Sequence, residues 1–197
     1  MRTAPQELPP REDDGLVLVR GTWEVFRGLL DARGEAPRPR FAFDDGDIEI
    51  MSPGRAHEVT RSKFGTLLEL YFLHARIRAY PWGSTRLSVP NNKKSLEPDE
   101  AYALSERDDR PDLAIEVVYT SGGLDKLKIY AALEVPEVWF WTAGEGLRVF
   151  VLRGDGYVPS ASSPQLPKLD LSLLERHLGL NNDLFELQSS FLAALNA

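Results

Sequence analysis

A single glutamate interrupts an otherwise apolar segment, residues 113–118, which reads LAIEVV. The nearly continuous apolar run predicts a central β-strand that is covered on both faces. Burial of an unpaired carboxylate in such a strand costs several kcal/mol. We therefore expect Glu116 to pair with a cation, to bind a metal ion, or to reach water at the strand end. This strand alone does not decide between a structural ion pair and a functional site.

A second carboxylate, Asp99, follows Pro98 in the strand expected over residues 97–104. Two adjacent strands can bring Asp99 and Glu116 within reach of one cation. Mg²⁺ prefers a few carboxylate oxygens together with water and phosphate, and a metal held in this way activates water and holds a phosphodiester. The pair therefore predicts a Mg²⁺ site, in which Mn²⁺ could substitute. The alternative for the Pro-Asp pair is a turn at the start of a strand.

Lys126 lies on a helix expected over residues 124–133 and shares an apolar stripe with Ile129 and Tyr130. A lysine on such a stripe is unusual for a fully solvated residue. We expect its ammonium to reach over the end of the sheet toward Glu116. The alternative is a side chain that lies along the protein surface.

Glu58, near the start of a long helix expected over residues 55–76, could add a third carboxylate. An exposed ion pair with Arg61, one turn away, is an equally good interpretation. The neighbouring His57 could act as a base. The three histidines, at positions 57, 74 and 177, show no metal-ligand spacing.

The length and composition indicate one globular unit. The 197 residues, 43% of them hydrophobic, fit a single domain over residues 13–197, preceded by a flexible proline-containing tail over residues 1–12. The absence of cysteine excludes disulfides, thiolate metal sites and a cysteine nucleophile, and it fits a cytoplasmic protein. No apolar run approaches the roughly 20 residues that span a bilayer, so we expect no membrane partner.

The net charge of -7 does not indicate a non-specific nucleic-acid-binding protein, which would normally be basic. A local basic rim can still steer phosphate groups. For any one basic residue, a solvated surface charge is the more ordinary interpretation. The basic residues near the expected site are Arg55, Arg61, Lys63, Arg86, Lys93 and Lys94. In the segment VWFW, Trp139 and Trp141 alternate along a strand and predict core positions more than base-stacking groups.

The apolar periodicity predicts strands and helices mixed around one sheet, an α/β (α+β) fold. An N-terminal strand-helix-hairpin extension is expected from a strand over 16–20, a helix over 23–33, and a hairpin over 40–43 and 48–51. Further strands are expected over 85–89, 97–104, 113–118, 137–141, 147–152 and 157–160, and further helices over 55–76, 124–133, 171–178 and 183–195.

Several motifs in this order resemble the Uma-type family of restriction endonucleases, a branch of the PD-(D/E)XK superfamily. The matching segments are MSPGRAHE at 51–58, EPDEAY at 97–102, RPDLAIEVVYTSGG at 110–123, DKLKIY at 125–130 and VPEVWFW at 135–141. The resemblance extends from about residue 22 to residue 178. Each segment alone is unspecific, but together and in this order they are specific.

The resemblance implies a restriction-endonuclease-like core, with a mixed central β-sheet flanked by helices, and a Mg²⁺-dependent site. By motif position, Asp99 matches the aspartate of the PD element and Glu116 the acid of the (D/E)XK element. Glu58 matches the helical glutamate that often accompanies them. Asp112 also follows a proline, but it lies only four residues before Glu116, and we interpret it as a strand-entry residue.

The lysine of the superfamily motif is displaced in this chain. Its usual place, two residues after the acid, is occupied by Val118. Members of the family commonly carry the lysine on the following helix instead, four residues before a tyrosine. Lys126 and Tyr130 fit that description.

The function that these residues favour is metal-dependent DNA endonuclease activity. Asp99 and Glu116 are expected to ligate the metal, with Glu58 as a further metal residue that binds directly or through water. Lys126 is expected to orient water or to stabilise charge on the phosphate. DNA is then the expected partner. The alternative is a catalytically inactive nucleic-acid- or protein-binding module on a nuclease fold, which the acidic net charge and Val118 favour.

A third interpretation is a structural subunit of a larger assembly. The C-terminal helix is amphipathic, and its apolar face could form a homodimer interface. That face carries Leu184, Leu187, Phe191 and Leu195.

Overall fold

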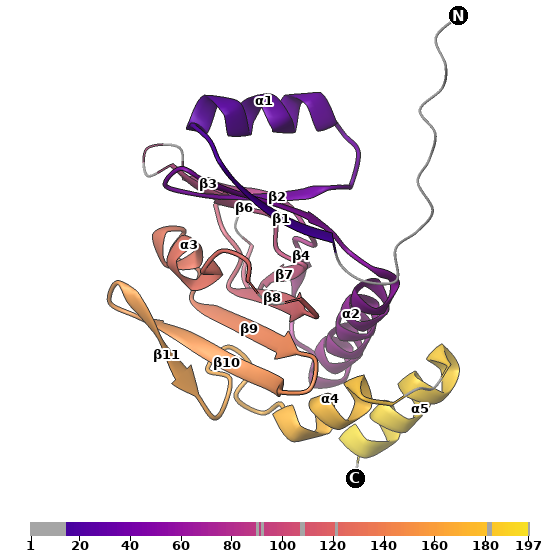
Figure 1. Cartoon of the computed structure of the whole chain (residues 1–197). Helices are drawn as coiled ribbons and strands as arrows, with labels where there is room; N and C mark the ends of the chain where they lie inside the picture. Colours follow the sequence, from indigo (N-terminus) through magenta and orange to yellow (C-terminus); the bar gives the residue numbers. More distant parts are fainter. Residues whose placement is uncertain are drawn as a thin grey trace, which may run out of the picture.

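The strands of the computed structural model form two stacked β-sheets, with helices outside and between them (Figure 1). The structure describes residues 15–89, 91, 93–106, 109–120, 122–180 and 183–196. The tail expected over residues 1–12 lies outside the described residues. None of the described helices combines the length and the apolar character that crossing a bilayer requires.

The first sheet contains the expected N-terminal unit. Its strand order is β1-β3-β2-β6-β5, and every pairing is antiparallel. The strands are β1 (Gly15–Arg20), β2 (Arg40–Asp44), β3 (Asp47–Ser52), β5 (Leu87–Val89) and β6 (Lys94–Leu96). Asp45 and Gly46, both at positive φ, form the tight turn between β2 and β3 and set the register in which Ala42 lies opposite Glu49.

Helix α1 (Trp23–Arg33) covers the outer face of this first sheet (Figure 1). The hydroxyl of Thr22 accepts a hydrogen bond from the amide of Val25, as expected for an N-cap residue. Phe26 of the helix is fully buried against Phe43 of β2, with 5.2 Å between their ring centroids.

The second sheet is the mixed central sheet that the sequence predicts. Its order is β11-β10-β9-β8-β7-β4, and β8 and β9 are parallel neighbours. Helix α3 (Lys126–Ala132) connects these two strands. The strands are β4 (Tyr80–Pro81), β7 (Glu100–Ala103), β8 (Leu113–Val118), β9 (Glu137–Thr142), β10 (Gly146–Arg153) and β11 (Gly156–Ser160).

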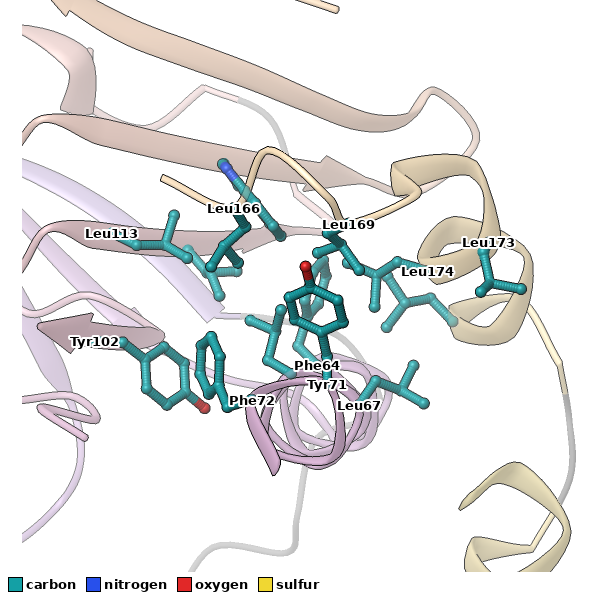
Figure 2. Close-up of a cluster of buried hydrophobic side chains, with 14 of the residues drawn as sticks. Phe64, Leu67, Tyr71, Phe72, Tyr102, Leu113, Leu166, Leu169, Leu173 and Leu174 are labelled. Carbon is teal, nitrogen blue, oxygen red and sulfur yellow. The ribbon is translucent and has the colours of Figure 1, made fainter. Parts of the chain in front are cut away.

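Helix α2 (Arg55–Ala75), with α4 (Leu171–Leu178) and α5 (Leu184–Leu195), covers the outer face of the second sheet. Figure 2 shows the resulting core, in which Phe64 and Leu67 of α2 lie near Leu166 and Leu174. Alternate residues of β8, including Leu113, point into this core. Large apolar side chains therefore fix α2 against the sheet.

The division of the strands between two sheets differs from the single sheet that the sequence predicts. Strands β4 and β6 have only two and three residues, too short for a recognisable alternation. The strand expected over residues 97–104 begins at Glu100, so Asp99 lies just before it. The helix expected from residue 124 begins at Lys126.

The apolar face of α5 is largely used within the chain itself. Leu187 and Phe191 are fully buried in the core shared with α2 and α4. Leu184, in contrast, is 56% exposed. A homodimer stays a prediction, but Leu187 and Phe191 are not available to a partner while α5 is packed in this way.

We predict that Phe191→Ala lowers the free energy of unfolding by about 3–5 kcal/mol, because it leaves a cavity where α5 meets the core. Urea unfolding of the whole chain, followed by circular dichroism, measures this loss. Phe185→Ala is the matched control: its ring lies on the same helix and is 78% exposed, so its cost should stay within about 0.5 kcal/mol. Equal unfolding midpoints for both variants would contradict the packing of α5.

Candidate functional site

The candidate site lies in the layer between the two sheets. Ala101 of β7 and Ala114 of β8 are opposite each other in the register and pack in a core cluster with Ala42 of the first sheet. Because successive side chains of a strand alternate between its faces, Glu116 lies on the same face as Ala114. Small alanines on both sheets leave space in this layer, and charged side chains occupy its end.

Glu116 is fully buried and has two partners from helix α3. The ammonium of Lys126 lies 2.6 Å from one carboxylate oxygen, and the hydroxyl of Tyr130 donates to the other at 2.5 Å. Lys126 thus contacts Glu116 as expected, although the two residues are ten positions apart in the sequence. Burial, together with the nearby carboxylate, raises the pKa of Tyr130 well above its usual value.

Lys126 also lies beside a second buried carboxylate, that of Glu49 in β3. One oxygen of Glu49 is 3.8 Å from the Lys126 ammonium, and the other accepts a hydrogen bond from the amide of Leu124 at 2.8 Å. Burial alone would lower the pKa of Lys126, but the charges of Glu116 and Glu49 outweigh it and the pKa is raised. The lysine is therefore a protonated cation held between two acids.

Gly123 makes the position of Glu49 possible. The Glu49 carboxylate occupies the space that a Cβ at position 123 would fill. A larger residue there would push Glu49 away from the segment that leads into α3. The glycine pair before α3 is thus more than a turn signal, since one of its members accommodates an acid from the other sheet.

Asp99 is held by three groups at the edge of the same layer. One of its oxygens pairs with the guanidinium of Arg40, from β2. The other accepts from the backbone amide of Val117 at 2.7 Å and lies 3.1 Å from Nε2 of His57, on α2. Asp99 and Lys126 line one small hollow, together with Arg40 and Glu49. The structure therefore brings Asp99, Glu116 and Lys126 to one place.

His57 acts as a hydrogen-bond donor to Asp99 in this arrangement. Burial, reinforced by the positive charge of Arg40, lowers its pKa to about 3, so the imidazole is neutral near neutral pH. A neutral ring that donates from Nε2 leaves Nδ1 unprotonated, and Nδ1 is buried without a hydrogen-bond partner among the described residues. These properties favour a role in orienting Asp99 over the role of a base that the sequence left open.

Glu58 is placed apart from the other acids. Its carboxylate is surrounded by the guanidinium groups of Arg61 at 3.1 Å, Arg38 at 3.2 Å and Arg40 at 3.6 Å. Burial alone would raise the pKa of Glu58, but the hydrogen bond from Arg61 and the arginine charges lower it. The ion pair with Arg61 is present, and Arg40 links Glu58 indirectly to Asp99.

The acids of the site alternate with cations. Arg40 lies between Asp99 and Glu58, and Lys126 lies between Glu116 and Glu49. Within the described part of the chain, no three histidine or acidic side chains converge into a group that could hold a metal ion. The roles of Asp99, Glu116 and Glu58 as metal ligands stay predictions.

The neighbouring motif positions also have defined places. Val118, where the superfamily lysine usually stands, lines a hollow of about 310 Å³ together with Lys126 and Glu49. Both positions thus open on the same space. Asp112 accepts from the amide of Leu104 at 2.7 Å and ties the entry of β8 to the end of β7, as expected for a strand-entry residue.

Sequence reasoning missed Arg40 and Glu49 as members of the site. Both are buried charges in short strands, which is the signal that drew attention to Glu116. Both residues lie in the expected N-terminal hairpin. Nothing in the sequence indicated that this hairpin packs against the strands and helices that carry the motifs. The sequence indicated Tyr130 only through its spacing of four residues from Lys126, as in the family. The structure adds its hydrogen bond to Glu116.

We predict that Glu49 and Lys126 are energetically coupled. Glu49→Gln and Lys126→Met should each cost about 1–3 kcal/mol, because each leaves a buried partner poorly satisfied. The double variant should differ from the sum by about 0.5–3 kcal/mol, as measured by urea unfolding. The control cycle pairs Glu49→Gln with Lys128→Met, since Lys128 is 70% exposed on the same helix. Strict additivity in both cycles would rule the coupling out.

Comparisons with known proteins support this picture of the fold. The model of the Uma2 family, described as "Putative restriction endonuclease", matches residues 23–182. A crystal structure of a "putative nuclease belonging to DUF820" from Anabaena variabilis ATCC 29413 is similar with a TM-score of 0.54 and 15% identity, over 75% of this chain and 96% of that one. A search of curated proteins found no match. Since the family model covers most of the chain, this protein belongs to the Uma2 family of restriction-endonuclease-like proteins.

Proposed function

We propose that this protein is a divalent-metal-dependent endonuclease that hydrolyses phosphodiester bonds in DNA. The observation that carries the proposal is the fully buried Glu116 with the ammonium of Lys126 at 2.6 Å, since the same Lys126 borders a small hollow together with Asp99. An acid and a lysine in contact on these two elements are what the family motif requires. Membership of the Uma2 family adds support for a nuclease.

The acids present suit Mg²⁺ or Mn²⁺ in their chemistry, because both ions prefer carboxylate oxygens. Asp99 and Glu116 would hold the ion. Arg40 pairs with Asp99 and also contacts Glu58, so its guanidinium would keep an acidic partner if Asp99 held an ion. Glu58 would assist the site as a further ligand, directly or through water, and it contacts Asp99's partner Arg40.

The bound metal would supply an activated water and would neutralise charge on the phosphate. The chain's own residues would orient the reaction. The raised pKa of Lys126 keeps its ammonium protonated, so Lys126 donates to the attacking water or to a phosphate oxygen and does not accept a proton. Tyr130 and His57 hold the carboxylates of Glu116 and Asp99 in fixed orientations.

We predict that Glu116→Gln and Asp99→Asn each reduce Mg²⁺-dependent plasmid cleavage by at least about 100-fold, because each removes a charged ligand while conserving shape. Isothermal titration calorimetry with Mn²⁺ should show weakened binding in both variants. Glu106→Gln, which alters an exposed acid, serves as the control and should cleave like the unmodified protein. Equal cleavage by all four proteins would remove Asp99 and Glu116 from the mechanism.

We predict a different outcome for the lysine. Lys126→Ala should reduce cleavage by about 100- to 1000-fold, because a preorganised donor to the developing charge is lost, while Mn²⁺ binding persists. Lys128→Ala changes an exposed lysine of the same helix and should leave the cleavage rate unchanged. The measurement is the initial rate of plasmid nicking at saturating Mg²⁺.

A wild-type rate in Lys126→Ala would show that the displaced lysine is not the motif lysine. A protein that neither cleaves DNA nor binds Mn²⁺ would instead favour the binding module that the sequence also allows.

A further inference from the structure

A groove of about 580 Å³ opens where the first turns of α2 meet the ends of β8 and β9. Arg55, Thr60 and Lys63 border it on the helix side, and Tyr119 and Trp141 on the sheet side. It is distinct from the inter-sheet hollow, because Tyr119 continues the alternate residues of β8 that face α2, whereas Glu116 faces the other sheet.

The charge of the groove differs from that of the chain as a whole. Two cations line it and no acidic side chain does, although the net charge of the chain is -7. The hollows beside α1 and beside Lys126, in contrast, both contain carboxylates. Arg55 is exposed and has no acidic partner among the described residues, whereas Lys63 donates to the carbonyl of Leu180 at the rim. The groove therefore favours an anion.

The aromatic side of the groove presents a fixed π surface. The rings of Tyr119 and Trp141 lie 5.5 Å apart at an interplanar angle of 50°, and Tyr119 is 40% exposed. The hydroxyl of Tyr119 is hydrogen-bonded to that of Thr60 at 2.9 Å, which restrains the ring. Trp141, expected in the core, is only partly buried, whereas Trp139 is fully buried as expected. A restrained and exposed ring such as that of Tyr119 is suited to stacking with a flat ligand.

The groove also adjoins the candidate site along the chain. Arg55 lies two residues before His57 on α2, and Tyr119 lies three residues after Glu116. A ligand in the groove would therefore lie on the α2 side of the sheet, on the helix that also carries His57, a partner of Asp99.

We propose that this groove binds single-stranded nucleic acid, with an unpaired base stacked on Tyr119 beside Trp141 and backbone phosphates contacting Arg55 and Lys63. Stacking on aromatic rings beside a cationic track is how proteins hold single strands, whereas a duplex hides its base faces. This inference rests on the proposed nuclease function. It deepens that function by naming an unpaired nucleic-acid strand as the ligand that the protein binds.

The test is fluorescence anisotropy with a labelled 12-nucleotide oligonucleotide, single-stranded or as a duplex, titrated with the full chain. The Glu116→Gln background and EDTA prevent cleavage, so binding is measured apart from catalysis. The single strand should bind more tightly than the duplex. Tyr119→Ala should weaken binding by about 5- to 150-fold, whereas Tyr119→Phe, which keeps the ring and loses only the hydroxyl, should retain most of the affinity.

Arg55→Ala should reduce the magnitude of the slope of log affinity against log salt by about 0.7, the value for one phosphate contact with a single strand. Tyr119→Ala should leave that slope unchanged. The matched control is Arg153→Ala, an exposed arginine at the far end of β10, which should change neither the affinity nor the slope. Urea midpoints of all variants confirm that they are folded.

Equal affinities of Tyr119→Ala, Arg55→Ala and the parent would overturn the groove assignment, as would absence of binding or tighter binding of the duplex. These outcomes are separate from the proposed function. A protein that cuts DNA while the groove variants bind normally refutes only the groove, and one that binds through the groove but never cuts refutes only the nuclease.

Discussion

The contact between the Glu116 carboxylate and the Lys126 ammonium is the interaction on which the rest of the site depends. Glu116 has no exposure to water, so its charge is tolerable only because Lys126 and Tyr130 satisfy it. Lys126 in turn lies 3.8 Å from the carboxylate of Glu49. The arrangement extends from β8 through α3 to β3, and it therefore ties the two sheets together through charge compensation.

The N-terminal unit is consequently part of the site and not an appendage. Arg40 from β2 contacts Asp99, and Glu49 from β3 contacts both Lys126 and the backbone before α3. The motif residues lie on the second sheet and its helices, while Arg40 and Glu49 add counter-charges for Asp99 and Lys126 from the first. Either sheet alone would leave some of these charges without their partners. The two sheets together bring each charge to its partner and bury the pair.

The sequence predicts individual elements of this fold better than their assembly. Thr22, the Asp45-Gly46 turn and the apolar stripes mark the ends of helices and strands because those signals are local. The burial of Glu116 and the helical phase of Lys126 were likewise readable from neighbouring residues. The pairing of the strands could not be predicted from neighbouring residues. Strand β6, for example, has only three residues and pairs with β2, which lies about fifty positions earlier in the sequence. The roles of Arg40 and Glu49 could not be predicted from the sequence, because they arise only when the two sheets stack.

The hairpin register of β2 and β3 has a consequence for the displaced lysine. A lysine on β8 would have its position fixed by the hydrogen bonds of its own sheet. Lys126, on α3, lies between Glu116 and Glu49. Glu49 faces inward because the turn at Asp45 and Gly46 places it opposite Ala42. A slip of one residue would turn Glu49 to the α1 side. The surroundings of Lys126 thus depend in part on a turn in the other sheet.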